Sequence, residues 1–289
     1  MSSSPPSPTT GTSGSAVPLP HYFRVCVTGA AGNISYLLLN RLPRQQWART
    51  LELFLLDIPP AMEALRGVVM ELEDCGLPQL RGIVATDIPK VAFQDADLVI
   101  LLGSSPRKPG LESPDILENN IALYREQGKL IDQVASRNVK VLVVSNPCNT
   151  NAWVCREHAP SIPAKNFTAL SRLDFNRAIA FVAARLAVDP SQVRSLVVWG
   201  NHASQRIAAD LGVAFVNNYP AQGHRTLLTD ILRENTAPFL AELNKVTILL
   251  ASVCYWDLTL LCFALVLVWS SSFETGLPSS KPRSRRSHG

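Results

Sequence analysis

Several features of this sequence carry groups that can bind ligands or exchange protons. A glycine turn runs from Gly29 to Gly32, and Asp57 follows a second apolar run. Further on, Asp174 and Arg177 lie at helical spacing, and His202 follows an apolar run that ends in tryptophan and glycine. Turns of this kind bind anions through the backbone, carboxylates accept hydrogen bonds, arginine binds carboxylates, and histidine exchanges protons near neutral pH. Each feature alone is usually structural, so their order and spacing carry the argument.

The glycine turn lies in the motif V-T-G-A-A-G-N-I, at the end of an apolar run. Glycine at positions 29 and 32 permits a tight turn close to a pyrophosphate, at the positive end of the following helix. A loop that merely joins a strand to a helix remains open for this motif alone. Asp57 argues against it, because a carboxylate there accepts hydrogen bonds from the adenosine ribose and repels a 2′-phosphate. Together they favour NAD over NADP, bound by Gly29, Ala30, Ala31, Gly32, Asn33, Ile34 and Asp57.

Buried strands are expected to position these groups. Runs that are apolar at nearly every position suit strands covered on both faces, and they occupy residues 24–28, 51–56, 96–103, 139–146 and 195–200. A shorter strand is expected near residues 83–86. Helices are predicted between them: apolar residues recur at helical spacing from Met62 to Leu72, and Pro114 marks the start of a helix that should reach about Arg137. This alternation predicts an α/β fold with a doubly wound parallel sheet.

Composition is typical of a globular protein without a nucleic-acid-binding face. The chain has 289 residues, 47% of them hydrophobic, and a formal net charge of +4. Four basic residues near the C-terminus account for all of that charge: Lys281, Arg283, Arg285 and Arg286. Six cysteines show neither a CxxC pair nor metal-ligand spacing, which predicts reduced thiols and no metal site: Cys26, Cys75, Cys148, Cys155, Cys254 and Cys262.

The first 20 residues contain no charged side chain and are rich in serine, proline, threonine and glycine, so they are expected to be disordered. They have neither the arginines of a mitochondrial presequence nor the basic start and apolar run of a secretory signal. A cytoplasmic location is therefore expected.

A family resemblance rests on several motifs in one order. These are TGAAGNI, LLDIPPAMEALRGVVMELEDC, ADLVILLGSSPRKPG, VVSNPCNTN, APSIPAKNFTALSRLDFNRA and VVWGNH. They resemble cytosolic-type malate dehydrogenases of the lactate/malate dehydrogenase family over roughly residues 24–205. The resemblance implies a Rossmann-type sheet, NAD as cofactor, malate and oxaloacetate as substrates, and a homodimer.

The resemblance also implies roles for individual residues. His202 would be the base that removes the hydroxyl proton, and Asp174 would hold its imidazole in the working tautomer. Arg177 would bind the C1 carboxylate and Arg107 the distal carboxylate, which makes the substrate a four-carbon diacid. Asn146 would orient the substrate and contact the nicotinamide end. Further cofactor contacts are implied at Ser35, Asn120, Gln127, Val144 and Ser145. If the family resemblance is set aside, the alternative interpretation of Arg107 is a solvated cation in a loop. The alternative interpretation of Asp174 and Arg177 is an ion pair on the surface of a helix.

Two departures from the family pattern bear on activity. Ser113 stands where the family has a second loop arginine, which polarises the reacting carbonyl. After about Gln205 the resemblance fades, and after Val246 it disappears, so the substrate domain is expected to be incomplete. The alternative function is therefore a catalytically impaired NAD-binding or interaction protein derived from a malate dehydrogenase.

The apolar run at residues 246–269 is long enough to span a bilayer, although Asp257 interrupts it. The preferred alternatives are a buried helix and an end produced by alternative splicing or an imperfect gene model, because nothing upstream suggests a membrane enzyme. The expected organisation is a disordered tail at 1–20, an NAD-binding domain at 21–170, a partial substrate domain at 171–245 and a divergent apolar and basic segment at 246–289.

Overall fold

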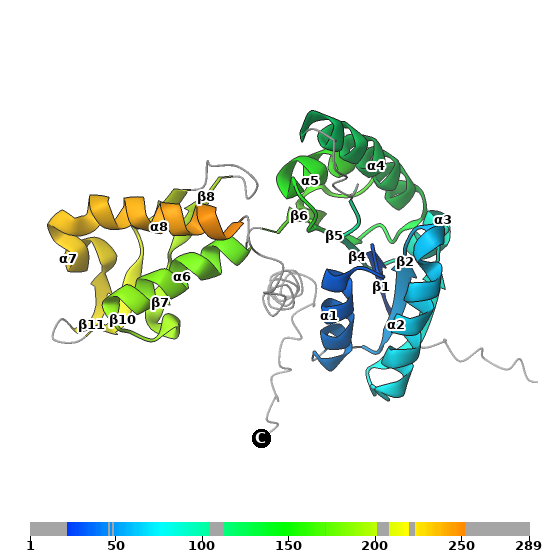
Figure 1. Cartoon of the computed structure of the whole chain (residues 1–289), viewed down its shortest axis with the longest axis horizontal. Helices are drawn as coiled ribbons and strands as arrows, with labels where there is room; N and C mark the ends of the chain where they lie inside the picture. The colour runs from blue at the N-terminus through cyan, green and yellow to red at the C-terminus, as the bar shows by residue number, and fades with distance from the viewer. Residues whose placement is uncertain are drawn as a thin grey trace, which may run out of the picture.

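The computed structural model of the chain describes residues 22–45, 47, 49–104, 113–170, 172–200, 208–219 and 223–251. Its first part is a parallel sheet of six strands, in the order β3-β2-β1-β4-β5-β6 (Figure 1). The strands are β1 Phe23–Thr28, β2 Leu51–Leu56, β3 Leu80–Thr86, β4 Leu98–Leu101, β5 Lys140–Val143 and β6 Phe167–Ala169. The order reverses between β1 and β4, which is the switch point of a doubly wound sheet. The predicted fold class is confirmed.

Helices cover both faces of this sheet. Side chains of α1 (Asn33–Arg41) and α2 (Met62–Asp74) pack in one core, and those of α3 (Pro89–Phe93), α4 (Ser113–Val134) and α5 (Cys148–Glu157) pack in the other. Within β1, Val25 and Val27 belong to the first core and Cys26 to the second. Successive strand residues point to opposite faces, so burial of both faces explains why the strands are apolar throughout. Short 3-10 turns lie at Leu42–Arg44, Pro59–Ala61 and Ala164–Asn166.

A second body follows from α6 (Arg172–Leu186) onward, with its own core. It contains a three-stranded antiparallel sheet in the order β11-β10-β7 and a two-stranded pair of β8 and β9. The strands are β7 Val193–Arg194, β8 Val197–Trp199, β9 Ala208–Asp210, β10 Phe215–Tyr219 and β11 Gly223–Leu227. The helices after them are α7 Leu228–Leu232 and α8 Thr236–Ala251, and 3-10 turns lie at Pro190–Gln192 and Arg233–Asn235.

One predicted strand has a different setting in the structure. Residues 195–200 were expected in the buried parallel sheet, but β8 pairs antiparallel with β9, and Trp199 is 61% exposed. The sixth parallel strand is β6, whose three residues are only partly buried. The prediction was wrong because apolar character alone does not distinguish a parallel from an antiparallel strand, and the three residues of β6 give little apolar signal of their own.

Several expectations fall on parts of the chain that the structure does not describe. These are the N-terminal tail at 1–20, residues 252–289 and two of the cysteines, Cys254 and Cys262. The four described cysteines are free: Cys26, Cys75, Cys148 and Cys155. Among the described helices, none combines the length and apolar character needed to cross a membrane.

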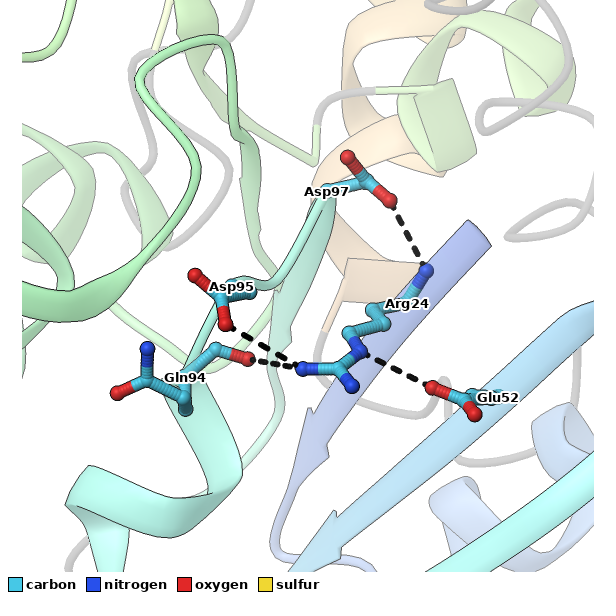
Figure 2. Close-up of polar contacts among 5 residues, drawn as sticks. All are labelled: Arg24, Glu52, Gln94, Asp95 and Asp97. Carbon is cyan, nitrogen blue, oxygen red and sulfur yellow. Dashed lines mark hydrogen bonds and ion pairs between the residues drawn. The ribbon is translucent and has the colours of Figure 1, made fainter. Parts of the chain in front are cut away.

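The amino-terminal edge of the sheet is held by a charged cluster around Arg24 (Figure 2). The backbone N–H of Arg24 donates to Asp97 Oδ2 at 3.0 Å, and its guanidinium contacts Glu52 Oε2 at 3.0 Å and Asp95 Oδ2 at 3.5 Å. The same guanidinium donates to the carbonyl of Gln94 at 3.5 Å. The cluster links β1, β2 and the segment before β4. Because these side chains are partly exposed, each ion pair contributes at most about 1 kcal/mol.

Gly128 lies where α4 meets α5, and we expect a side chain there to be destabilising. A Cβ at this position would lie 2.4 Å from the carbonyl oxygen of Cys155, which belongs to a helix backbone. Gly128→Ala is therefore expected to lower the free energy of unfolding by about 1–3 kcal/mol, although alanine favours helices. Gly67→Ala in α2 is the matched control, because nothing lies within 4 Å of its Cβ. It should be neutral or raise stability by about 0.4–1 kcal/mol. Urea unfolding of both variants checks this, and equal stabilities would contradict it.

Candidate functional site

The glycine turn joins β1 to α1 at the carboxyl edge of the sheet. Gly29 has φ +65°, and a Cβ on it would lie 2.9 Å from the backbone N and Cα of Gly103. Position 29 therefore needs glycine for both its conformation and its space. The turn is closed by the N–H of Gly32, which donates to the carbonyl of Gly29 at 3.0 Å.

The first turn of α1 offers backbone N–H groups at this edge. In the described part of the chain, no side chain caps this end of the helix and no acidic residue lies in its first turn. Free amides and the positive end of the helix dipole favour an anion here. Gly32 and Asn33 are exposed, Ala31 and Ile34 are partly buried, and Ala30 is buried. Ser35 is 1% exposed, and its hydroxyl donates to the carbonyl of Gly29 at 2.6 Å, so it braces the turn from inside.

Asp57 links the end of β2 to the glycine turn. Its Oδ2 accepts a hydrogen bond from the N–H of Ala31 at 2.8 Å, and its Oδ1 accepts one from the N–H of Ile58 at 2.8 Å. Each carboxylate oxygen has more than one acceptor site, so two backbone bonds leave room for hydroxyl donors. The carboxylate predicted to bind the ribose therefore lies against the turn predicted to bind the pyrophosphate.

The segment after β5 carries the next predicted site residues. The N–H groups of Val144 and Ser145 approach the carbonyl of Leu101 at 3.0 and 3.4 Å. Asn146 is exposed and precedes a cis bond to Pro147. Its carbonyl accepts from Asn120 Nδ2 at 3.4 Å, which ties the segment to α4.

Asn120 and Gln127 both lie on the buried side of α4. They are 1% and 7% exposed, and Gln127 Oε1 has no hydrogen-bond partner among the described residues. At these exposures neither side chain presents much surface to a ligand.

Asp174 and Arg177 form an ion pair in the first turns of α6. Arg177 Nη1 lies 3.4 Å from Asp174 Oδ1, and the side chains of Arg177 and Asp174 are 11% and 2% exposed. Burial, and to a smaller extent the charge of Asp174, raises the pKa of the Cys148 thiol to about 11. Cys148 opens α5 two residues after Asn146, and its Sγ donates to the carbonyl of Leu170 at 3.5 Å. The buried pair therefore lies near the segment that carries Asn146.

Two predicted site residues, Arg107 and His202, lie outside the described residues, as does the side chain of Ser113. What the structure brings to the carboxyl edge is the glycine turn, Asp57, the 144–146 segment and the start of α6. Within the described part of the chain, His, Cys, Asp and Glu side chains form no group of three that could hold a metal ion.

Sequence reasoning missed the residues that join these segments to one another. Gly103 follows β4, and its N–H donates to Thr28 Oγ1 at 3.1 Å, which fixes the close approach to Gly29. Tyr124 in α4 is fully buried, yet its hydroxyl donates to the carbonyl of Gly103 at 3.0 Å and contacts Ser145 Oγ. A glycine at the end of an apolar strand was a usable signal for the first contact. The sequence carried no signal for the contacts of Tyr124, because a tyrosine on the buried face of a helix looks like any other apolar core residue.

Comparison with known proteins agrees with this architecture. Residues 23–168 match the family model described as the lactate/malate dehydrogenase, NAD binding domain. The solved structure of Trichomonas vaginalis lactate dehydrogenase in complex with NADH and oxamate is 39% identical, covering 77% of this chain and 67% of that chain with a TM-score of 0.70. Malate dehydrogenase from Naegleria fowleri is 33% identical, covering 86% and 76% with a TM-score of 0.74. The chain therefore belongs to the lactate/malate dehydrogenase family of NAD-dependent oxidoreductases.

Proposed function

We propose that this protein interconverts malate and oxaloacetate with NAD as the hydride carrier. The observation that carries the proposal is the buried pair of Asp174 and Arg177 beside the Asn146 segment. A partly buried arginine at the carboxyl edge of the sheet suits an anionic substrate, because its planar guanidinium binds carboxylates through paired hydrogen bonds. Asp174 balances its charge in the absence of substrate.

The described residues fit the dinucleotide. Glycine at position 29 keeps the turn tight, because a Cβ there would meet the Gly103 backbone at 2.9 Å, and the uncapped end of α1 offers amides to the pyrophosphate. Asp57 would hold the adenosine ribose on the β2 side of the switch point, and the 144–146 segment would flank the nicotinamide on the β5 side. When bound, NAD supplies the electrophilic carbon that accepts hydride from C2 of malate.

The chain's own groups would bind the substrate and move the proton. Arg177 would hold the C1 carboxylate and so orient C2, while Asn146 would bind near the reacting hydroxyl. His202 would take the hydroxyl proton as the C2–H bond breaks, and Asp174 would stabilise the resulting imidazolium. In the reverse direction the same imidazolium would return the proton to the carbonyl oxygen of oxaloacetate.

A four-carbon diacid is proposed over lactate because of Arg107, a second cation, which follows β4 in the sequence. If this cation binds the distal carboxylate, oxaloacetate should be preferred over pyruvate by roughly 100-fold or more in kcat/KM, since pyruvate leaves it unpaired. Arg107→Gln should lower the ratio of kcat/KM for oxaloacetate to kcat/KM for pyruvate, mainly by lowering kcat/KM for oxaloacetate. Arg125→Gln, on an exposed position of α4, is the matched control and should leave the ratio unchanged.

The measurement is the loss of NADH absorbance as the cofactor is oxidised, with each 2-oxo acid in turn as the substrate. A wild-type protein that prefers pyruvate would overturn the diacid proposal and leave the family assignment intact.

A second candidate is an NAD-binding protein with impaired chemistry, and Ser113 is the observation that favours it. In the family pattern an arginine at this position polarises the reacting carbonyl, and a serine cannot supply that fixed positive charge. NADH binding without turnover would separate this candidate from the first.

A further inference from the structure

A chain of buried and partly buried hydrogen bonds crosses the part of the site assigned to the nicotinamide. The hydroxyl of Tyr124 donates to the carbonyl of Gly103 at 3.0 Å and contacts Ser145 Oγ. Asn151 Nδ2 donates to the carbonyl of Ser145 at 3.0 Å and approaches its Oγ at 3.5 Å. Gly103 in turn donates to Thr28 Oγ1 at 3.1 Å. One connected set of bonds therefore joins the ends of β1, β4 and β5 to α4 and α5.

The direction of these bonds follows from the groups themselves. The carbonyl of Gly103 can only accept, so the single hydroxyl proton of Tyr124 is committed to it. Ser145 must then donate to the Tyr124 oxygen, and its own oxygen is left to accept from Asn151. Burial raises the pKa of Tyr124 further above its usual value, so the phenol remains a donor throughout the working pH range. Bonds aligned in one direction polarise and strengthen one another.

The segments that this set of bonds holds are the ones that flank the proposed ligand. Gly103 packs against Gly29 of the glycine turn, and Ser145 immediately precedes Asn146. Both lie at the ends of β4 and β5, on the opposite side of β1 from β2 and Asp57. In a doubly wound sheet the two halves of a dinucleotide lie on opposite sides of the switch point. Both bonds of the Tyr124 hydroxyl therefore go to segments on the nicotinamide side, and only Gly103 also touches the glycine turn.

We propose that Tyr124 is a positioning residue, whose hydroxyl sets the Gly103 and Ser145 segments in the conformation that binds the nicotinamide half of NADH. This inference rests on the proposed NAD-dependent function. Tyr124 itself is fully buried and acts through the backbone of these segments. Its loss leaves the partly buried carbonyl of Gly103 and the buried hydroxyl of Ser145 short of a partner, and the segments would shift to recover one.

The test compares NADH with ADP-ribose, which retains the pyrophosphate and adenosine but lacks nicotinamide. Isothermal titration calorimetry would give the Kd of each ligand for wild type, Tyr124→Phe and Ser145→Ala. We expect Tyr124→Phe to weaken NADH binding by roughly 10-fold, with ADP-ribose changed less than about 2-fold. Ser145→Ala should give the same pattern, and the double variant should add little to either single one, because both act in one network.

Thr168→Val is the matched control. Thr168 Oγ1 donates to the carbonyl of Val141 at 3.1 Å, so this change also removes a hydroxyl bonded to backbone in the same sheet. It should leave both affinities unchanged. If Tyr124→Phe weakens the binding of NADH and of ADP-ribose equally, Tyr124 contributes only to general stability and the inference fails. Unaltered NADH binding would also overturn the inference. A wild-type protein that binds ADP-ribose and NADH equally poorly would instead overturn the proposed function, and the inference with it.

Discussion

Oxaloacetate reduction by the wild-type protein is expected to be weak, roughly 10²–10³-fold below that of a relative with arginine at the position of Ser113. The physical reason is charge on the carbonyl oxygen, which becomes more negative as hydride arrives at C2. A fixed guanidinium stabilises that charge, whereas a serine hydroxyl supplies a neutral donor. Lys108, five residues before Ser113 in the sequence, carries a point charge without the planar fork of a guanidinium and should replace only part of the effect.

Three variants test this expectation in a single-turnover assay with NADH and oxaloacetate. Ser113→Arg should raise the rate by about tenfold, which is part of the deficit, because the new side chain must also be held in place. His202→Asn should abolish the remaining activity in either background, since it removes the proposed proton carrier. Arg125→Gln should change nothing. A wild type that already turns over at about 10–10³ per second, and loses this with His202→Asn, would show that Ser113 does not limit the chemistry.

NADPH is expected to bind tens-fold more weakly than NADH, and Asp57 is the reason. Its carboxylate is held toward the turn by the N–H groups of Ala31 and Ile58, both at 2.8 Å, so it cannot simply swing away from a 2′-phosphate. Two like charges about 4 Å apart repel by about 1 kcal/mol in water and about 4 kcal/mol near a protein surface, and a tens-fold ratio lies between these limits. Fluorescence titration of both cofactors measures it.

Asp57→Asn removes the charge and keeps one of the two hydrogen bonds, because an amide nitrogen cannot accept from the N–H of Ile58. The amide oxygen can still accept from Ala31, while the negative charge is gone. The ratio of the two Kd values should therefore fall towards one, mainly through tighter NADPH binding. Equal affinities in the wild type, or a ratio unmoved by Asp57→Asn, would contradict this account of specificity.

The sequence predicted the parts of the fold that have a strong apolar period. Strand β2 has the predicted bounds, β1 begins one residue earlier, and α4 begins at the residue before Pro114. These succeed because strands buried on both faces and a helix opened by proline leave signals within a few residues. Strand β6 could not be predicted in this way, because the strand conformation of three residues at a sheet edge depends on pairing with β5 rather than on their own composition.

The candidate site likewise contains some residues that could be predicted from the sequence and others that could not. The glycine turn and Asp57 could be found from local spacing, since a tight turn and a strand-ending acid are both local requirements. The mutual pairing of Asp174 with Arg177 in a buried setting could not, because the same spacing on a surface helix looks identical. Tyr124 and Gly103 are 21 residues apart and meet only through the packing of α4 on the sheet.

Helix α6 belongs to both bodies of the protein, and this has a consequence for how the chain assembles during its synthesis. Leu173 packs against the core under α1 and α2, whereas Ala178, Val182 and Ala183 lie in the second core. The parallel sheet is complete once β6 has paired with β5, and domains generally fold as units from the amino end as the chain is made. The edge proposed to hold the dinucleotide can therefore form before the far half of α6 has a core to join. Order of synthesis then sets the order of assembly, with a cofactor-binding surface first and the rigid placement of Asp174 and Arg177 after it.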